Sequence, residues 1–554
     1  MNLGRREMLA ALLGLPALLS GCSSQHKPPH LTGRIVGPSN KLGHRLRQAA
    51  RPIPPADAWQ PCGVVIVGGG IAGLAAAWRL QKAGFHDFAV IEMEPVPGGT
   101  SASGSSDLVS FPWAAHYVPV PMKENRALVS LLDEMGILEG HDSEGEPIVA
   151  EQFLCRDPQE RIFYKGRWYE GLYLYAGSTA EDRAQLQAFQ AEMDRWAAWR
   201  DSRGRRAFAL PIAAGSDDAE VTALDRLTMT EWLDRHGWTS PRLRWLVDYS
   251  CRDDYGTTSD ETSAWAGVFY FTSRTRRPGM RSQPLITWPE GNGRVVSHLH
   301  GRAKDRVRLG WLVADIIPQQ TAGASGLDVV IMDNSGSDVR GLHAEQVIFA
   351  APQFLASHVI RDYRQSPPAH LREFHYAPWL VANIFLHARP GGLGFPLSWD
   401  NVFYESPSLG YVTATHQACI DHGPTVLTYY YPFAGDSPRE ARAELLDMDW
   451  EQCADLVMSD LGRAHAEIGT LVDRLDVMRW GHAMIRPRPG FLWGPARKAA
   501  ARPYRGIHFG NTDLSGVALL EEAFYHGLRA AEEVLAARRV EFTSMLGYPG
   551  SNML

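Results

Sequence analysis

The residues best suited to chemistry in this chain are a glycine-rich turn and an acid that follows it. The turn, Gly68-Gly69-Gly70-Ile71-Ala72-Gly73, has the spacing G-x-G-x-x-G with one extra glycine, and Glu92 lies further along the chain. The glycines permit a sharp turn and a close approach to a diphosphate, and a carboxylate at the position of Glu92 accepts ribose hydroxyls. The pattern predicts a dinucleotide-binding site.

Apolar segments on both sides of the turn would position it. Val64–Val67 is long enough for a buried strand, Leu74–Lys82 has apolar residues at helical spacing, and Phe88–Ile91 is a second apolar run that ends at Glu92. The free N–H groups and the dipole at the start of such a helix favour an anionic phosphate. Because strand, turn, helix, strand and acid occur in this order, an ordinary glycine-rich turn is the weaker alternative.

Residues after the acid distinguish among the dinucleotides. Pro95–Thr100 (PVPGGT) places a glycine pair after Glu92 and resembles the E-x(n)-G-G signature of the flavin amine oxidase and phytoene desaturase superfamily. Phe111–Tyr117 (FPWAAHY) resembles the superfamily segment F-D-x-G-A-H-Y beside the flavin, with Ala114 in place of the glycine. This resemblance implies FAD as the cofactor.

Two later stretches resemble the same superfamily. A strand within residues 288–352 resembles a V-x-x-I segment, in which the backbone of Val313 would contact adenine. In residues 506–535 a strand precedes a long helix, and the resemblance implies that Asp513 contacts the ribityl chain or the diphosphate. The residues implied to bind FAD are Gly68, Gly69, Gly70, Ala72, Gly73, Glu92, Met93, Gly99, Thr100, Val313, Gly510, Asn511 and Asp513.

The order of these stretches implies the fold class. We expect an α/β protein with a Rossmann-like FAD-binding domain assembled from discontinuous segments and an α+β substrate-binding domain inserted into it. The FAD-binding domain would comprise residues 61–122, 283–355 and 501–540, and the substrate domain residues 123–282 and 356–500.

The first residues are predicted to target and tether the protein. Arg5-Arg6 before the apolar run Leu9–Leu19 is typical of a twin-arginine signal, and the Leu-Ser-Gly-Cys sequence ending at Cys22 resembles a bacterial lipobox. We expect a signal peptide over residues 1–22 and a basic linker over residues 23–60. The protein would then lie on the periplasmic side of a bacterial membrane, anchored through a lipid on Cys22. A plain signal peptide or an uncleaved anchor is the alternative.

Composition limits the remaining choices. With 45% apolar and 21% charged residues among 554, the chain has the composition of a globular protein. The net charge is −7, and residues 1–56 carry 8 basic and 1 acidic side chain, so the rest is near −14. Such a charge attracts cations and repels nucleic acid, although it can serve solubility alone. The six cysteines have no C-x-x-C spacing, so we expect neither a metal site nor a disulfide framework.

The resemblance implies no protein base of fixed identity, so the catalytic residues stay unassigned. His116, Trp480 and His482 are implied to lie near the flavin, with packing in the core as the alternative. Asn383 is aligned with the position at which many amine oxidases carry a lysine hydrogen-bonded through water to flavin N5. Its presence there favours a quinone or another carrier as the electron acceptor, with oxygen as the alternative. No cysteine occurs where related enzymes attach the flavin, so we expect non-covalent FAD.

Two features bear on the substrate. Trp399–Tyr411 and Thr428–Phe433 are rich in aromatic residues, which either line a cavity over the flavin or pack a strand face on a core. Asp253-Asp254 could meet a cationic substrate, and a solvated loop is the favoured interpretation.

We therefore expect a small-molecule oxidoreductase that takes a hydride from a C–N bond of an amine, with cationic amines and polyamines as candidates. A desaturase or isomerase of the phytoene desaturase type, acting on an apolar lipid or isoprenoid, is the alternative, and a non-enzymatic binding protein the third.

Overall fold

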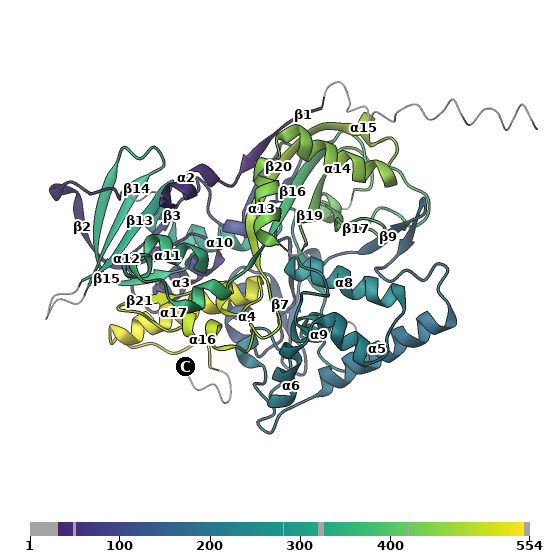
Figure 1. Cartoon of the computed structure of the whole chain (residues 1–554), viewed down its shortest axis with the longest axis horizontal. Coiled ribbons are helices and arrows are strands. Elements are labelled where there is room, and N and C mark those ends of the chain that lie inside the picture. The colour runs from purple at the N-terminus through teal and green to yellow at the C-terminus, as the bar shows by residue number, and fades with distance from the viewer. Residues whose placement is uncertain are drawn as a thin grey trace, which may run out of the picture.

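Two β-sheets organise the computed structural model, which describes residues 31–47, 51–280, 282–319, 326–418, 420–435 and 437–547. Figure 1 shows one sheet with its helices at the left and the other at the upper right, above a group of helices that includes α5, α8 and α9. The predicted signal peptide and Cys22 lie outside the described residues. Among the described residues, no helix is both long and apolar enough to cross a membrane.

The first sheet has seven strands and carries the glycine-rich turn at the end of β2. Its order is β12 (Val307–Leu309), β3 (Phe88–Glu92), β2 (Trp59–Val67), β15 (Val339–Phe349), β14 (Leu327–Asp333) and β13 (Trp311–Pro318), with β21 (Ile507–Phe509) also paired to β15. β12, β3, β2, β15 and β21 pair in parallel, whereas β13, β14 and β15 form an antiparallel meander. The sheet thus joins three separated stretches of sequence.

Alternation along β2 explains why both faces of this sheet are covered. Val64 and Ile66 pack with the helices α3 (Ile71–Lys82), α10 (Gly293–Ala303) and α17 (Leu520–Ala537), whereas Val65 and Val67 pack with residues of the β13–β14 hairpin, α11 (Ala356–Val359) and α12 (Arg361–Gln365). Successive side chains of a strand point to opposite faces, so an uninterrupted apolar run is buried on both.

The second sheet has eight strands and builds the substrate domain. Its order is β1 (Thr32–Gly37), β20 (Val472–Ile485), β16 (Tyr376–Leu386), β19 (Thr425–Pro432), β18 (Gly410–Thr413), β17 (Asp400–Phe403), β9 (Glu160–Tyr164) and β10 (Arg167–Glu170). One face packs with α14 (Trp450–Ala464), and the other faces the first domain. Helices α5 (Ala180–Ala198), α7 (Met229–Arg235), α8 (Pro241–Tyr255) and α9 (Ala264–Thr272) form a separate apolar cluster.

Shorter elements complete the chain. They are α2 (Asn40–His44), α4 (Arg126–Glu134), α6 (Ala219–Ala223), α13 (Pro438–Asp447), α15 (Ile468–Leu471), α16 (Pro495–Ala500), and the strands β4 (Ser103–Ser105), β5 (Ser110–Pro112), β6 (Tyr117–Pro119), β7 (Leu138–His141), β8 (Pro147–Val149) and β11 (Leu285–Thr287). Although α4 falls in the range expected for the substrate domain, its buried leucines join the cluster formed by α3 and α17.

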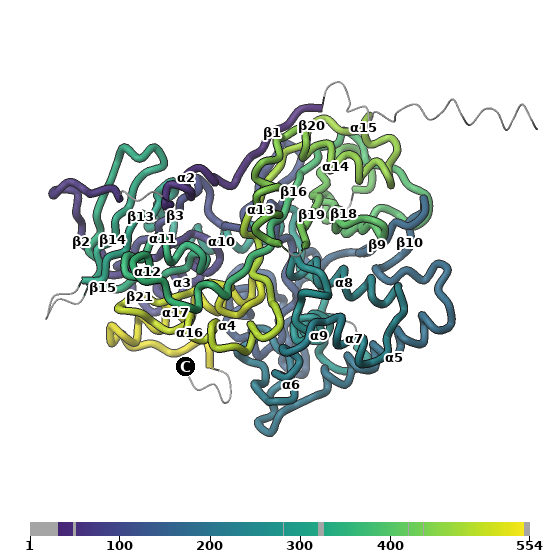
Figure 2. Tube along the Cα trace, viewed as in Figure 1, coloured from purple at the N-terminus to yellow at the C-terminus, as the bar shows by residue number. Residues whose placement is uncertain are grey.

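The expected linker over residues 23–60 is wrong for much of its described part, where β1, α2 and the start of β2 form. β1 pairs in parallel with β20, with Thr32 opposite Arg474, and the chain then crosses to α2 beside the first sheet (Figure 2). There the Ser39 N–H donates a hydrogen bond to a Glu94 carboxylate oxygen at 2.8 Å. β1 is a partly exposed edge strand without a buried residue, and backbone hydrogen bonds hold it, so its basic, glycine-containing sequence lacks the apolar alternation that identifies a strand.

Gly527 allows close packing of α3 and α17, two helices of the first domain that are far apart in the sequence. A Cβ atom on Gly527 of α17 would lie 2.1 Å from the Ala72 carbonyl oxygen at the start of α3. Only glycine permits this approach, and it brings the last segment of the chain against the glycine-rich turn.

We expect Gly527→Ala to destabilise the fold by about 1–3 kcal/mol, because the added methyl group pushes α17 away from α3. Gly301→Ala in α10 is the matched control, since a Cβ there meets nothing within 4 Å. The control should be neutral or stabilising by up to about 1 kcal/mol, the helix propensity difference. Thermal unfolding of the two variants measures their stability. Equal melting temperatures would show that the close approach of α17 to α3 does not contribute to stability.

Candidate active site

Glu92 is held against the glycine-rich turn. The Gly69 N–H donates to Glu92 Oε2 at 2.6 Å, and the Glu94 N–H donates to Oε1 at 2.7 Å. Burial raises the pKa of Glu92, and these two hydrogen bonds act in the opposite direction. The carboxylate therefore has one defined orientation at the end of β3, beside the expected ribose position.

The turn itself forms a cradle of backbone. A Cβ atom on Gly73 would lie 1.9 Å from the Gly68 carbonyl oxygen, so α3 begins pressed against the turn. In contrast, Cβ atoms on Gly70 and Gly99 would meet only Gly98 O at 3.9 Å and Gly70 Cα at 3.7 Å. No side chain of the described residues caps α3, so its first N–H groups stay available. This cradle fits a diphosphate at a helix N-terminus.

The other implied FAD-binding residues have different surroundings. Asp513 is buried and accepts hydrogen bonds from the Gln353 N–H at 2.7 Å and the Tyr376 hydroxyl at 2.6 Å, and burial raises its pKa to about 6. The Asn511 side chain donates to the Ala350 carbonyl at 3.0 Å. Both side chains thus connect the ends of β15 and β21, which braces the edge of the sheet where the turn lies.

Two further implied residues pack on the opposite face of the sheet from α3. Met93 and Val313 belong to the apolar cluster that contains Val65. The chain nevertheless passes Glu92 four residues before Val313, because Leu309 of β12 lies opposite Glu92 of β3. Ala72 and Gly510 both contact α17: the Ala72 carbonyl lies against Gly527, and a Cβ on Gly510 would meet the His526 carbonyl oxygen at 2.9 Å.

A cavity of about 140 Å³ opens between the two domains, with Thr100 in its wall. The FAD-binding domain contributes Thr100, Asn292, Leu519, Leu520 and Glu521. The substrate sheet contributes side chains from five consecutive strands: Trp480 of β20, Trp379 and Val381 of β16, Tyr430 of β19, Val412 of β18 and Asp400 of β17. Of the eight aromatic residues noted in the two aromatic segments, Tyr430 alone lines this cavity, and Tyr411 and Tyr429 pack in the core behind the sheet.

Asn292 is a cavity residue that sequence reasoning did not single out. It is 2% exposed, and its Oδ1 has no hydrogen-bond partner among the described residues. It lies in the turn Trp288–Arg294 (WPEGNGR), whose proline and two glycines were the available signal. A buried amide oxygen without a donor is costly, so this position suits a polar group supplied by the cofactor.

The three weak catalytic candidates separate in the structure. His116 and Trp480 line the cavity, whereas His482 does not and instead stacks on Phe354, with ring centroids 4.0 Å apart. Burial lowers the pKa of His116 to about 4, so the ring is neutral at pH 7. The Trp480 indole donates to the Trp113 carbonyl at 2.8 Å. Trp480 therefore has a positioning role for the segment that carries His116.

Asn383 is buried in β16 and contacts the segment that resembles a flavin contact. Asn383 does not line the cavity: its Nδ2 donates to the Pro112 carbonyl at 3.0 Å, and its Oδ1 accepts from the Thr428 hydroxyl at 2.8 Å. Val381, two residues earlier on β16, is the strand residue that reaches the cavity beside Trp379. Val381 and Asn383 share one strand face, because side chains two residues apart in a strand point to the same side.

Acidic side chains gather in the cavity wall. Asp253, Asp254, Asp400 and Glu521 line it, together with one arginine, Arg274. Arg274 pairs with Asp254 at 3.1 Å. The interpretation of Asp253-Asp254 as a solvated loop is wrong, because both residues belong to the last turn of α8 and face the cavity.

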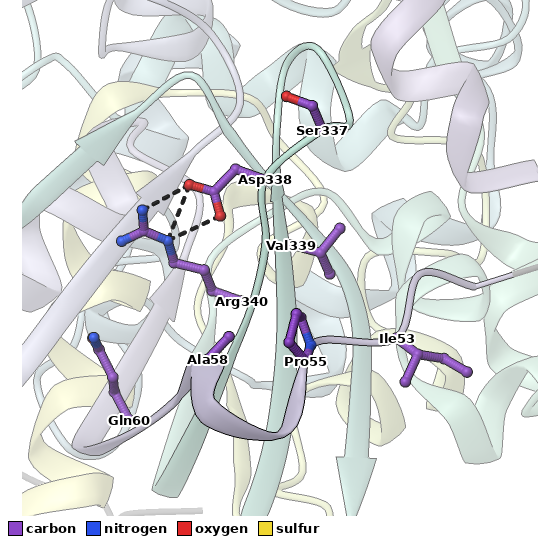
Figure 3. Close-up of a pocket in the computed structure, with 8 residues that line it drawn as sticks. All are labelled: Ile53, Pro55, Ala58, Gln60, Ser337, Asp338, Val339 and Arg340. Carbon is purple, nitrogen blue, oxygen red and sulfur yellow. Dashed lines mark hydrogen bonds and ion pairs between the residues drawn. The ribbon is translucent and has the colours of Figure 1, made fainter.

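A second, open hollow lies at the other end of β2 (Figure 3). It is lined by Ala58 and Gln60 at the start of the strand and by Asp338 and Arg340 of the β14–β15 hairpin, which pair at 2.6 Å. Because the glycine-rich turn follows the opposite end of β2, this hollow is separate from the cofactor cradle.

Comparison with known proteins agrees with this site. A family model described as flavin containing amine oxidoreductase matches residues 71–535. The chain belongs to this family, and its cofactor is FAD, which confirms both predictions. The cradle beside Glu92 and the unpartnered Asn292 are consistent with that cofactor.

Solved structures show the same fold. Putrescine oxidase bound to putrescine is 18% identical with a TM-score of 0.63, over 86% of this chain and 100% of the other. Cyclohexylamine oxidase from Brevibacterium oxydans is 16% identical with a TM-score of 0.59, and the match covers 87% of this chain and 100% of the other. A fatty acid isomerase from P. acnes is 14% identical with a TM-score of 0.58, and the match covers 86% of this chain and 98% of the other. The expected α/β fold class is confirmed.

Glu92→Ala should weaken FAD binding by about 1–3 kcal/mol, because it removes the ribose acceptor and leaves the Gly69 and Glu94 N–H groups without their partner. Glu139→Ala, at an exposed position of β7, is the control and should leave FAD binding unchanged. Flavin fluorescence titration of the apoproteins gives both dissociation constants. Unchanged affinity in the Glu92 variant would contradict the proposed position of the ribose.

Proposed function

We propose that this protein oxidises an amine that is cationic at neutral pH to the corresponding imine, for which FAD would supply the acceptor of the hydride that leaves the carbon of the C–N bond. The observation that carries the proposal is the excess of carboxylates in a cavity whose wall continues from the FAD-binding segments. FAD supplies the redox chemistry when bound, and the chain positions the substrate and tunes the surroundings. Two fold neighbours, putrescine oxidase and cyclohexylamine oxidase, are named after amines, which is compatible with this class.

The charges in the cavity favour a cationic substrate. Four carboxylates line it, and its one arginine is already paired with Asp254. His116 adds no positive charge at pH 7 because burial lowers its pKa to about 4. Tyr430 and Trp379 provide aromatic surface, which attracts cations through their ring quadrupoles.

An apolar substrate is the second candidate. Val381, Leu409 and Val412 form an apolar part of the wall, and one fold neighbour is a fatty acid isomerase. An apolar chain would leave Asp253 and Asp400 without a partner in a desolvated site, which is unfavourable. We therefore place the desaturase or isomerase function second.

The charges of the residues that line the same cavity bear on the choice of electron acceptor. Among the described residues that line it there is no lysine, and Arg274 is neutralised by Asp254. A free cation near the flavin is thus lacking, and this supports a quinone or another carrier as the acceptor in place of oxygen.

The location is also a proposal. The twin-arginine pattern at Arg5-Arg6 and the lipobox-like sequence ending at Cys22 support export of the folded, FAD-loaded protein and lipid anchoring at a bacterial membrane. Twin-arginine transport carries folded proteins, so cofactor insertion in the cytoplasm is compatible with this route.

Anaerobic bleaching of the flavin tests the reaction. We expect primary amines and diamines to bleach the absorption of the FAD-loaded protein, and isoprenoids and fatty acids to leave it unchanged. Stopped-flow reoxidation of the bleached protein should be faster with a quinone than with oxygen. Bleaching by isoprenoids alone would favour the second candidate, and an oxygen rate equal to turnover would contradict the proposed acceptor.

Export is tested with two variants of the precursor. Replacing Arg5 and Arg6 by lysine should retain the FAD-loaded precursor in the cytoplasm, and Cys22→Ala should abolish labelling by radioactive palmitate. Cell fractionation with antibody detection measures both. Normal export of the double-lysine variant would show that another secretion route is used.

A further inference from the structure

We propose that Ser39 is a positioning residue for Glu92, the acid expected to bind the FAD ribose, and that an N-terminal strap holds Ser39 in place. The strap consists of residues 31–39 and runs from the substrate sheet to the first domain. Ser39 acts through Glu94, whose backbone contacts Glu92. The inference concerns the cofactor alone, so it goes beyond the proposed amine oxidation and does not depend on the substrate.

Ser39 binds both oxygen atoms of the Glu94 carboxylate. Its N–H donates to Oε1 at 2.8 Å, and its hydroxyl donates to Oε2 at 2.8 Å. Hydrogen bonds to an ionised carboxylate are shorter and stronger than those between neutral groups. The two donors therefore fix the side chain of Glu94, which follows the ribose acid by two residues in the chain.

The backbone of Glu94 contacts Glu92 in turn. The Glu94 N–H donates to Glu92 Oε1 at 2.7 Å, and the Glu94 carbonyl accepts from the Gly310 N–H at 3.1 Å. Glu92 thus receives one N–H donor from the glycine-rich turn, at Gly69, and the other from a residue whose side chain is bound by Ser39. If Ser39 releases Glu94, the second donor is free to move and the Glu92 carboxylate loses its defined orientation.

The Ser39 hydroxyl does not have the local role that its position favours. Ser39 occupies the N-cap position of α2, where a serine side chain usually accepts a hydrogen bond from the helix backbone. Among the described residues it makes no such capping bond. Its hydroxyl instead binds an acid 55 positions further along the chain. This indicates a role for the hydroxyl in the first domain rather than in the start of α2.

Apolar anchors hold this part of the chain on both domains. Leu31 is buried in the cluster of the substrate sheet that contains Leu475, and Leu46, shortly after α2, is buried in the cluster of the first sheet that contains Val65. Between the two anchors the chain crosses from β1 to α2 (Figure 1). Ser39 lies at the end of this crossing, so its position depends on the attachment of the strap to both sheets.

A glycine seats β1 against the substrate sheet. A Cβ atom on Gly33 would lie 1.8 Å from the Leu475 carbonyl oxygen and 2.8 Å from Trp450 Nε1. The same carbonyl accepts a hydrogen bond from the Trp450 indole at 2.9 Å. Even an alanine at position 33 must therefore push β1 away from β20. This substitution loosens the far end of the strap without touching the FAD-binding domain.

Fluorescence titration of the apoproteins with FAD tests the role of Ser39. Ser39→Ala should raise the dissociation constant about three- to tenfold, because it removes a hydrogen bond to a charged group. Ser39→Thr keeps the hydroxyl donor and should stay within about twofold of the wild type. Unchanged affinity in the alanine variant would overturn the inference, as would equal losses in the alanine and threonine variants.

A double variant tests whether Ser39 acts through the ribose acid. In the background of Glu92→Ala, the change Ser39→Ala should weaken FAD binding by less than about twofold, because no carboxylate remains to be positioned. A loss in that background as large as in the wild type would show that Ser39 acts on FAD by another path, and this would overturn the positioning role.

Gly33→Ala tests the strap. It should raise the FAD dissociation constant about threefold, although it lies on the substrate sheet, because Ser39 is then less firmly held. Combined with Ser39→Ala, it should add less than its own single effect, since both changes act on the same contact. Gly43→Ala in α2 is the matched control and should keep the wild-type affinity, because a Cβ there meets nothing within 4 Å. Unchanged affinity in Gly33→Ala, or single effects that multiply in the double variant, would overturn the strap.

Hydrogen exchange of the apoproteins separates positioning from stability. Amides within residues 92–96 should exchange faster in Ser39→Ala than in the wild type, whereas those of the core strand β15 should be unchanged. Faster exchange in both segments, with unchanged FAD affinity of the folded protein, would show a purely structural role and refute the inference. If Gly33→Ala fails to fold, the comparison of Ser39→Ala with Ser39→Thr still decides whether Ser39 positions Glu92.

Discussion

The hydrogen bond from the Gly69 N–H to the Glu92 carboxylate, at 2.6 Å, is the contact on which the site depends. It joins the glycine-rich turn after β2 to the end of β3, and so fixes the expected diphosphate and ribose positions relative to each other. Gly527 extends the same constraint to the end of the chain, because α17 can reach the Ala72 carbonyl only through a residue without a side chain. The backbone cradle, the acid and the last helix thus form one rigid unit.

A second constraint is electrostatic. The substrate sheet places Asp400 opposite Glu160, and α8 adds Asp253. Burial raises the pKa values of all three acids, which means that the folded protein holds them at a cost when no cation is present. Sites that store such a cost are typical of ligand recognition. The cavity joins this acidic end to the FAD-binding segments, and one reaction can use both.

The cofactor site could be predicted because its determinants are local in sequence. The turn Gly68–Gly73, Glu92 and the strand before the turn fall within one supersecondary unit, and each residue type has a direct physical reason. β1 could not be predicted, since an exposed edge strand needs backbone pairing with β20 and no apolar pattern. The surroundings of Asn383 could not be predicted, because residues 381 and 383 share one strand face and sequence alone does not show where the cavity begins.

The acidic wall of the cavity could not be predicted for a different reason. Asp253 and Asp400 are far apart in the chain, and only the pairing of β17 with β9 and the packing of α8 bring them together. The most direct test of the whole account is a crystal structure of the reduced, FAD-bound protein with 1,4-diaminobutane. The account predicts the FAD ribose on Glu92, the diphosphate at the start of α3, and the amine in the cavity lined by Asp253, Asp254, Asp400 and Glu521. FAD bound away from the glycine-rich turn, or a diamine bound outside this cavity, would contradict it.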